Sequence, residues 1–593
     1  MALVNCAVTL CSSGSIMTAT FIPGKDQALE VSISRIGQAI TDLGFSIEEV
    51  RWLNPAPHIW SVHIRDKDCP QVFSNGKGAS RNAALASAYG ELIERLSTRY
   101  LWADFMLDPI LGEFGFIHQA EEKWFDPDDN QWPKDLLDDR WRELYVDSQE
   151  LELAQLRDMN GGGTGKGICA LPYTRQSDGK TVYVPVNMIA NLFVSNGMSA
   201  GNNRDEAVVQ GLSEIFERAI KERIIGEAIA LPEVPEEVLS RHPHILEGME
   251  ALRGHGFGVR ALDASLGGTY PVMCLLLQHP DGGVYASFGA HPTFLVALER
   301  ALTELLQGRA LDELGDFPPP TADMDMVAEP HNMELHFIDS SGYVSWALLS
   351  DEPDVAFADW DADSPWAKDN ETACRQLLDL LHGEGHEVYI AEHTALGAYA
   401  CRILVPGFSD IYLPDELILQ NNNACLDVRP LLFDLEAAGP EGWARILELL
   451  DRQNVNDQLK VFEWAGLVGD SSPWGRLRMG EFRIWLLLAL GEREEAYELM
   501  PPVLASGDLS ADERLRYRAL HATLELVLCS EDPRPYRRAL VQYYGEETVS
   551  AAEAWVEGEV RFPGLGKLDA AAPTEGHRRL LEAYRKVLTG QQR

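Results

Sequence analysis

The sequence predicts a large mixed α/β domain followed by an all-α region, and three observations lead to this prediction. A chain of 593 residues is longer than one hydrophobic core normally supports, so more than one domain is expected. Residues 17–435 alternate short β-rich runs with amphipathic helical patterns. Strand patterns vanish in residues 436–593, where Leu, Ala, Glu and Arg recur at helical spacing.

The elements of the first domain follow from its periodicities. Runs rich in β-branched and aromatic residues, bounded by Gly, Asp or Pro, predict strands at 60–66, 181–194, 270–278, 284–290, 387–393 and 400–407. Amphipathic patterns predict helices at 27–43, 80–103, 203–226, 292–313 and 370–384. A Pro-rich, acidic stretch at 314–330 is expected to be a loop within this domain.

The C-terminal region has the pattern of paired helices. ALGEREEAYEL at 489–499 resembles the turn of a tetratricopeptide-like (TPR-like) repeat, with a Gly turn followed by Ala and Tyr on the packing face. Its period is irregular, so degenerate helical hairpins are expected, and such arrays usually hold partners or a dimer mate. A helical cap without a partner is the alternative, and a homodimer through its apolar helices is expected.

Charge and cysteine usage narrow the function classes. Acidic residues outnumber basic ones, 92 to 50, and a formal charge of -42 excludes a broad nucleic-acid surface or an anionic membrane surface. Nine widely spaced cysteines and the absence of an 18-residue apolar run predict a cytoplasmic protein. Residues 1–16 lack the basic start of a signal peptide, and Met17 is an alternative start, so we expect an N-terminal extension.

The string Glu-apolar-apolar-Glu-Arg occurs twice, as ELIER at 91–95 and as EIFER at 214–218. Polar residues around both strings recur at helical spacing and form a stripe on one helix face, and a third helix carries a similar stripe. Arg95, Arg218 and Arg309 follow the three stripes. The stripes consist of Ser87, Glu91 and Glu94; of Glu206, Gln210, Glu214 and Glu217; and of Arg300, Glu304 and Gln307.

The residues beside these stripes are apolar, so the stripes are expected to face an interior site. Several inward-facing carboxylates cannot all stay ionised unless cations lie among them. Arginine alone could supply these cations, which would make the stripes buried ion-pair networks. The repetition favours instead a polyphosphate site, in which Glu binds Mg²⁺ and Arg contacts the phosphates.

A glycine-rich stretch at 160–169 does not change this interpretation. It fails the Walker A pattern, because Asn160 stands at the first glycine position and Gly167 stands where Ser or Thr would ligate Mg²⁺. We expect a flexible surface loop. A nucleotide would therefore bind without a P-loop.

The sequence shows no arrangement for a side-chain nucleophile. Phosphoryl transfer does not require one, because positioning and charge neutralisation do most of the catalytic work. The histidines are expected at strand ends or in loops, and two cysteines in buried strands. These residues are His291, His331, His336, Cys169 and Cys274.

At these helices the chain strongly resembles the YcaO family, and the resemblance covers almost the whole chain. It implies a YcaO-type fold, distinct from P-loop and Rossmann folds, and the TPR-like form of the C-terminal region. The motifs occur in order: FIPGKD at 21–26, NPxPxxWSVHIRDK at 54–67, SxxxExxER at 87–95, SNGMSAGN at 195–202, ExxER at 214–218, RxxxExxQxR at 300–309 and FIDSSG at 337–342.

The resemblance implies ATP and Mg²⁺ as cofactors. Many members phosphorylate a backbone amide oxygen, which permits cyclodehydration to azolines or replacement by sulfur, so ATP hydrolysis or amide-type activation is expected. The implied metal ligands are Glu91, Glu94, Glu214 and Glu217, with Glu206 adjoining. The implied nucleotide contacts are Lys25, Ser32, Ser87, Arg95, Ser199, Asn202, Arg218 and Arg300, with Glu304 adjoining.

The resemblance also implies partners. Members with this C-terminal region are associated with β-methylthiolation of an aspartate in a small-subunit ribosomal protein, as accessory factors to the radical methylthiotransferase RimO. The sequence has no CxxxCxxC motif, so the iron–sulfur chemistry would belong to the partner. The end, KVLTGQQR, lacks the Pro-rich tail of azoline-forming members. Two alternatives stay open: a non-catalytic adaptor stabilised by ATP, and an ATP-dependent enzyme that modifies the backbone of a separate peptide.

Overall fold

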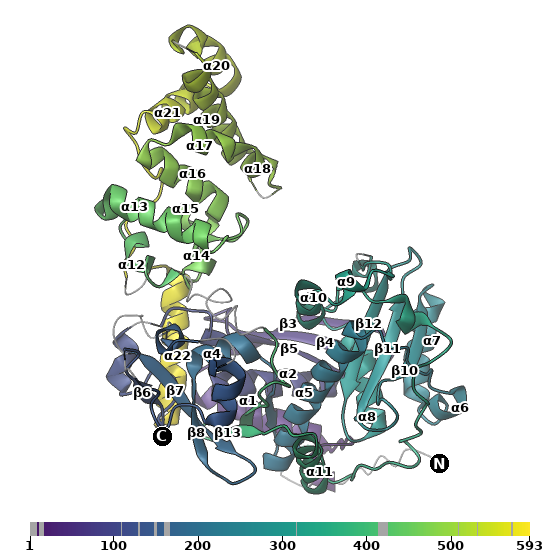
Figure 1. Ribbon diagram of the computed structural model, residues 1–593. Coiled ribbons are helices and arrows are strands. Elements are labelled where there is room, and N and C mark those ends of the chain that lie inside the picture. The colour runs from purple at the N-terminus through teal and green to yellow at the C-terminus, as the bar shows by residue number, and fades with distance from the viewer. Residues whose placement is uncertain are drawn as a thin grey trace.

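The computed structural model confirms the two-part fold class, with an α/β body and a helical tail that rises from it (Figure 1). Most of the predicted extension at 1–16 and the centre of the glycine-rich loop, 161–166, lie outside the described residues. Within the described residues, no helix combines the length and hydropathy that a membrane span requires. The described residues are 9–10, 17–107, 109–128, 131–147, 151–158, 160, 167–315, 317–412, 425–507, 509–530, 532–570 and 573–592.

Antiparallel sheets form the framework of the body. One contains β3 (Ile47–Ala56), β4 (Ile59–Asp66) and β5 (Phe73–Gly78) in that order, and a second contains β10 (Gly258–Asp263), β11 (Val272–Gln278) and β12 (Val284–Ala290). A third has the order β6-β7-β13-β14-β9, with β8 paired to β7. Its strands are β6 (Lys123–Phe125), β7 (Ile168–Arg175), β8 (Thr181–Pro185), β9 (Met198–Gly201), β13 (Tyr389–His393) and β14 (Tyr399–Leu404). A short pair, β1 (Thr9–Leu10) with β2 (Met17–Thr18), precedes them.

Side-chain caps set the starts of several main helices. Ser80 accepts a hydrogen bond from a main-chain N–H in the first turn of α2, and Asn203 and Asp369 do the same for α5 and α11. The longer helices of the body are α1 (Leu29–Asp42), α2 (Arg81–Thr98), α5 (Arg204–Gly226), α7 (Pro243–Gly254), α8 (Phe294–Glu304), α10 (Pro330–Ile338) and α11 (Asn370–Gly383). The short ones are α3 (Asp139–Trp141), α4 (Val186–Met188), α6 (Glu236–Leu239) and α9 (Met324–Val327).

Two units of the body are built alike, each as a helix, three antiparallel strands and a helix. The first runs from α1 through β3–β5 to α2, and the second from α7 through β10–β12 to α8. In the first, the Ser74 hydroxyl donates to the Ala88 carbonyl at 2.8 Å. In the second, the Ser287 hydroxyl donates to the Ala301 carbonyl at the same distance. The sequence interpretation did not find this internal similarity.

Glycines let the last helix of each unit approach its sheet closely. A Cβ atom at Gly76 would lie 2.0 Å from a main-chain oxygen of α2, and one at Gly289 would lie 2.3 Å from a main-chain oxygen of α8. Only a glycine permits such contacts. Gly76 approaches Ala84 and Gly289 approaches Ala297, so Glu91 and Glu304, each seven residues further on, occupy corresponding positions of α2 and α8.

Several sequence predictions of local structure were wrong. The predicted strand at 181–194 ends at Pro185, and residues 186–193 are helical, because a continuous apolar run does not distinguish a buried helix from a strand. The predicted helix at 292–313 ends at Glu304, and the loop predicted at 314–330 contains α9. His331 and His336 lie in α10 and not at a strand end or in a loop.

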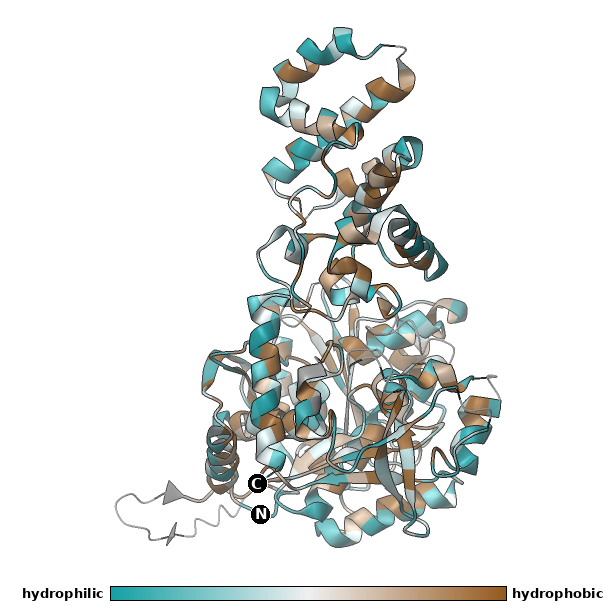
Figure 2. Ribbon diagram, turned by 90° about the vertical axis from the view of Figure 1, so that its left-hand side faces the viewer, coloured by the Kyte–Doolittle hydropathy of each residue, from teal (hydrophilic) through white to brown (hydrophobic). Residues whose placement is uncertain are grey.

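The tail consists of α12–α21. The predicted TPR-like turn is a helix–turn–helix, in which α16 ends at Leu490, Gly491 follows with φ +87°, and α17 begins at Arg493. Hydrophobic and hydrophilic residues alternate around its helices, as in amphipathic helices (Figure 2). The helices are α12 (Arg429–Leu432), α13 (Leu435–Arg452), α14 (Val461–Trp464), α15 (Pro473–Arg476), α16 (Met479–Leu490), α17 (Arg493–Glu498), α18 (Met500–Ala505), α19 (Ala511–Cys529), α20 (Arg537–Tyr544) and α21 (Glu546–Val556).

The last helix, α22 (Glu575–Gln591), returns to the body (Figure 1). The Trp102 indole N–H donates to the Leu580 carbonyl at 3.1 Å, and the Trp102 and Tyr584 rings meet edge to face at 4.9 Å. The Tyr584 hydroxyl donates to the Ile117 carbonyl. Leu588 shares one hydrophobic core with the buried face of α2. The end of the chain therefore supports the helix that carries the first Glu-Arg string.

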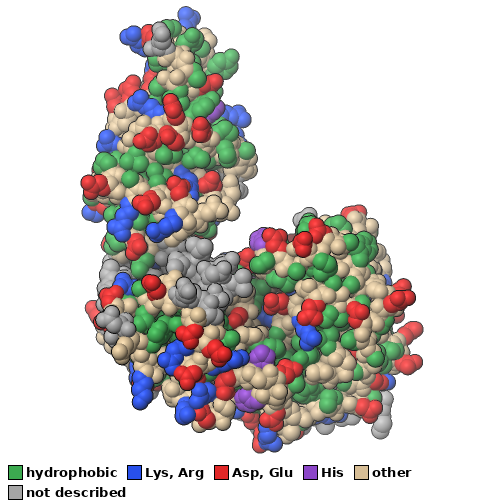
Figure 3. Space-filling view, viewed as in Figure 1, with side chains coloured by type: hydrophobic (Ala, Val, Ile, Leu, Met, Phe, Trp, Pro, Cys, Tyr) green, Lys and Arg blue, Asp and Glu red, His purple; other side chains and the backbone are tan. Residues whose placement is uncertain are grey.

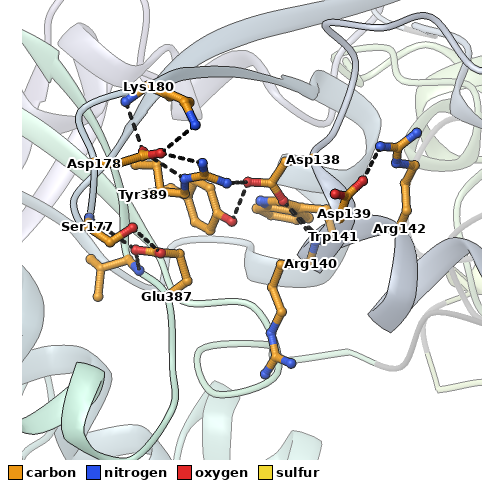
Figure 4. Close-up of polar contacts among 12 residues, drawn as sticks. Asp138, Asp139, Arg140, Trp141, Arg142, Ser177, Asp178, Lys180, Glu387 and Tyr389 are labelled. Carbon is orange, nitrogen blue, oxygen red and sulfur yellow. Dashed lines mark hydrogen bonds and ion pairs between the residues drawn. The ribbon is translucent and has the colours of Figure 1, made fainter.

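A polar network holds the β7–β8 hairpin against β13 (Figure 4). Arg175 pairs with Asp138 at 2.8 Å and with Asp178 at 2.6 Å, and the Tyr389 hydroxyl donates to Asp138 at 2.7 Å. Asp138 also caps α3. The charged and hydroxyl groups of this network are hydrogen-bonded to one another, so the network stabilises the third sheet.

Candidate functional site

Three helices bring the predicted acids together. α2 carries Glu91 and Glu94, α5 carries Glu214 and Glu217, and α8 carries Glu304. We call these five residues the carboxylate cluster. The first unit's α2 packs on β5 and β9, α5 packs on β9 and β12, and α8 packs on β12 and β5, so shared strands hold the three helices around one place.

Lys77 on β5 lies within this cluster, although the sequence interpretation missed it. Burial lowers the pKa of Lys77 to about 8, and the charges of Glu217, Arg300, Glu91 and Glu214 all act on it. Lys77 forms an ion pair with Glu304 of the other unit. The available signal in the sequence was the order Gly76-Lys77-Gly78 in a strand. Successive side chains of a strand point to opposite faces, so Lys77 faces the side of β5 opposite to the glycines that approach α2.

Each of four acids in the cluster has a cation of its own. Arg218 pairs with Glu214 at 3.0 Å and Arg300 with Glu217 at 3.3 Å, while Arg95 pairs with Glu91 and Lys77 with Glu304. These contacts resemble the ion-pair alternative considered from the sequence. Among the described residues, no group of three or more His, Cys, Asp or Glu side chains is arranged to hold a metal ion.

Glu94 is the fifth acid, and its carboxylate contacts no cation or hydrogen-bond donor among the described side chains. Burial raises the pKa of Glu94 well above its usual range, and the charges of Glu214 and Glu91 act in the same direction. Arg402 is near, but its guanidinium donates to main-chain carbonyls. The charges of Arg95 and Arg402 act in the opposite direction without contacting the carboxylate, and a buried acid of this kind beside two others is an environment that a divalent cation would neutralise.

One partner of each of three ion pairs lines a cleft of about 520 Å³, whereas Glu91, Glu94 and Arg95 are not among its lining residues. Glu217, Arg218, Glu304, Gln307 and Asn75 line it. Side-chain exposure of 28% for Arg218 and 33% for Glu304 leaves both partly accessible to solvent. The volume lies within the usual range for small-molecule sites.

A second group of predicted residues surrounds Glu206. Asn202 donates to both oxygens of Glu206, at 3.1 and 2.9 Å, and Lys25 lies 3.3 Å away. The Ser32 hydroxyl donates to the Asn202 side-chain oxygen at 2.8 Å, and Arg35 donates to the same oxygen at 3.0 Å. Arg35 was missed; its position one turn after Ser32 on α1 was the available signal.

His291 lies near both groups. Burial lowers the pKa of His291 to about 3, and the positive charges of Arg300 and Lys25 act in the same direction. Its Nδ1 accepts a hydrogen bond from the Thr293 main-chain N–H at 2.9 Å, so the neutral ring carries its proton on Nε2. The sequence placed His291 correctly at a strand end but did not indicate that it lies near Arg300 and Lys25.

Two residues that were predicted to contact the nucleotide lie outside both groups. Ser199 is completely buried, and its hydroxyl donates to the Ala207 carbonyl at 2.7 Å, which ties β9 to α5. Ser87 is half-buried on α2, and its hydroxyl forms no hydrogen bond with either group among the described residues.

The fold and the site define a class: a mixed α/β protein that presents helix-borne acids and guanidinium groups to one cleft, with a helical tail. Residues 75–409 match the family described as YcaO cyclodehydratase, ATP- and Mg²⁺-binding. Residues 425–593 match the YcaO cyclodehydratase C-terminal domain. The chain belongs to the YcaO family, a family that binds ATP and Mg²⁺.

Known relatives extend over nearly the whole chain. It is 48% identical over 580 residues to the "Ribosomal protein S12 methylthiotransferase accessory factor YcaO" of Escherichia coli, covering 96% of this chain and 98% of that protein. It is also 48% identical over 578 residues to an uncharacterized protein of Haemophilus influenzae, with the same coverage of 96% and 98%. A structure of YcaO from Methanopyrus kandleri, bound with AMPPCP and Mg²⁺, is 18% identical with a TM-score of 0.40, covering 65% of this chain and 92% of that one.

Proposed function

We propose that this chain binds ATP with Mg²⁺ at the carboxylate cluster and acts as an accessory factor in methylthiolation of ribosomal protein S12. The observation that carries the proposal is the 48% identity with the Escherichia coli accessory factor over 98% of that protein. The unpaired Glu94 carboxylate beside Glu91 and Glu214 supports the metal-binding part.

The roles of the residues follow from their chemistry. Glu91, Glu94, Glu214 and Glu217 would hold Mg²⁺, which when bound neutralises phosphate charge. Arg95, Arg218 and Arg300 would exchange their carboxylate partners for phosphate oxygens, since a guanidinium binds both in the same planar geometry. Glu206 would adjoin the metal ligands. Lys25, Ser32 and Asn202, with Glu304 at the other group, would complete the nucleotide contacts.

We also propose the chemistry and setting. The site would hydrolyse ATP or activate an amide oxygen by phosphorylation, which requires positioning and not a side-chain nucleophile. The partner would be a RimO-type radical methylthiotransferase or the ribosomal protein itself. The protein would work as a homodimer in the cytoplasm, and the cysteine thiols of the body, buried in its core, suit a reducing compartment.

The test is complementation of Escherichia coli cells that lack the related accessory factor, with mass spectrometry of the target aspartate in S12. The variants are Glu91→Gln with Glu214→Gln, and Glu448→Gln on the exposed face of α13 as the matched control. Magnesium-dependent ATP titration of each purified variant is measured in parallel.

Loss of both ATP binding and S12 modification in the double variant, with an unaffected control, is the expected result. Modification that persists without ATP binding would instead establish the adaptor and reject the ATP-dependent account. A wild-type chain that neither binds ATP nor restores modification would overturn the whole proposal.

A further inference from the structure

A second cleft lies in the tail and shares no lining residue with the cleft of the body. We call it the tail cleft. Its volume is about 470 Å³, and it is lined by residues of α15, α16, α19 and α21, by Lys460 before α14, and by residues 563–565. This volume accommodates one or two large side chains of a bound molecule.

Part of the lining of the tail cleft is aromatic. Trp485 is 7% exposed, its ring lies 5.8 Å from that of Tyr517, and it meets the Trp555 ring edge to face at 5.3 Å. Leu477 and Leu565 add apolar surface. Rigid indole rings of this kind anchor an aromatic or large aliphatic side chain at a protein interface.

The acids of the tail cleft are already engaged within the chain. Glu481 accepts hydrogen bonds from the Tyr517 hydroxyl at 2.6 Å and from the Arg478 main-chain N–H at 3.2 Å. Glu513 accepts from the main-chain N–H and hydroxyl of Ser510, at 2.9 and 2.6 Å, in the capping box of α19. These bonds engage both oxygens of Glu481 and one oxygen of Glu513, and the other Glu513 oxygen pairs with Arg476, so both acids are already partnered within the chain.

Four cations line the tail cleft, and two of them are engaged within the chain: Arg478 donates to the Gln458 carbonyl at 2.8 Å, and Lys460 pairs with Glu463 at 3.6 Å. Lys460, Arg476, Arg478 and Arg516 line it, and Arg516 is exposed, with no hydrogen bond or ion pair among the described residues. Arg476 is 58% exposed and pairs only loosely with Glu513, at 3.4 Å. On the visible face of the tail, basic and acidic side chains both lie among hydrophobic ones (Figure 3). A concentration of positive charge is unusual in a chain with a formal charge of -42.

We propose that the tail cleft binds an acidic peptide segment of a partner protein. An aromatic or large aliphatic side chain would pack against Trp485 and Trp555, and flanking Asp or Glu side chains would pair with Arg476 and Arg516. A peptide carries a few carboxylates that match this local patch. The dense phosphate charge of a nucleic acid would instead meet the acidic surface of the whole chain.

The experiment measures fluorescence anisotropy of fluorescein-labelled peptides with the full chain, at about 0.15 M salt to screen unspecific attraction. The test peptide is GDEDWLDEDG. One control peptide replaces Trp and Leu by Ala, a second replaces the acids by Asn and Gln, and a labelled oligouridylate tests nucleic acid. The protein variants are Arg476→Ala with Arg516→Ala, and Arg538→Ala on the exposed side of α20 as the matched control.

The test peptide is expected to bind saturably, with both control peptides at least tenfold weaker. The double variant should bind it at least tenfold more weakly, the Arg538→Ala variant should bind like wild type, and all proteins should keep the wild-type melting temperature and ATP affinity. Equal binding of the three peptides, no binding at all, or equal effects of the two arginine changes would overturn the proposal. Tighter binding of the oligouridylate with the same dependence on Arg476 and Arg516 would assign the tail cleft to nucleic acid instead. ATP affinity is independent of every one of these outcomes, so the proposed function is tested separately.

Discussion

Replacing Glu94 by Gln should make the protein more stable without Mg²⁺ and poorer at binding Mg²⁺ and ATP. In the free protein, four acids of the carboxylate cluster have a cation and Glu94 has none. The substitution keeps the shape of the side chain and removes a negative charge that Glu91 and Glu214 repel. Substitution of a structural residue lowers stability. A variant that is more stable but binds Mg²⁺ and ATP less tightly therefore identifies Glu94 as a metal ligand.

The size of the effect follows from burial. An unsatisfied buried polar group costs about 1–3 kcal/mol, and Glu94 is only half-buried, so we expect Glu94→Gln to add about 1 kcal/mol to the free energy of unfolding. This corresponds to a rise in melting temperature of about 2 °C for a domain of this size. Loss of a metal ligand should weaken Mg²⁺-dependent ATP binding at least about tenfold, or ~1.4 kcal/mol.

The stability gain should depend on pH. The pKa of Glu94 is raised in the folded state above its ordinary value of 4.5, so the folded protein holds this proton more tightly than the unfolded chain. Wild-type stability therefore falls as pH rises from 4.5 through the raised pKa, whereas the Gln variant does not lose this contribution. The advantage of the variant should be absent near pH 4.5 and largest above neutrality.

Differential scanning fluorimetry across pH, without Mg²⁺, checks the stability, and calorimetric titration of ATP with Mg²⁺ checks the binding. Glu448→Gln, which removes an exposed acid of α13, is the control and should change neither quantity. A Glu94→Gln protein that is less stable above neutral pH, or that binds ATP with Mg²⁺ as tightly as wild type, would refute the role given to Glu94.

Three further predictions test other parts of the structure. Gly24→Ala should lower the free energy of unfolding by about 1–3 kcal/mol and should also weaken ATP binding. Gly24 has φ +77°, and a Cβ atom there would lie 2.7 Å from His291. Thermal unfolding and ATP titration measure the two effects. Tyr584→Phe should lower the melting temperature of the body, since it leaves a buried carbonyl unpaired at a cost of about 1–3 kcal/mol, and unchanged melting would argue against the role of α22. Ser199→Ala should cost about 1 kcal/mol of stability and leave ATP affinity unchanged, because the hydroxyl is fully buried; a large affinity loss would return Ser199 to the nucleotide contacts.

Much of the local structure was predictable because its signals are local. The stripes that include Glu91 and Glu214 have helical spacing, and the observed helices α2 and α5 lie within a few residues of the predicted ranges. Gly491 marked a turn between two tail helices, and the structure places it there. The apolar run at 181–194 was misread because burial on all sides removes the periodicity that separates helix from strand.

The sequence by itself determined which helices carry acids and arginines, because a 3.6-residue period and a repeated string can be read along one stretch of chain. Only the tertiary structure decided which acid is left without a cation, since the pairing of Lys77 with Glu304 joins residues from two similar units that share a strand–helix contact. The same holds for α22, which joins the core behind α2. Contacts between distant segments depend on how sheets and helices pack, and no periodicity along the chain records that packing.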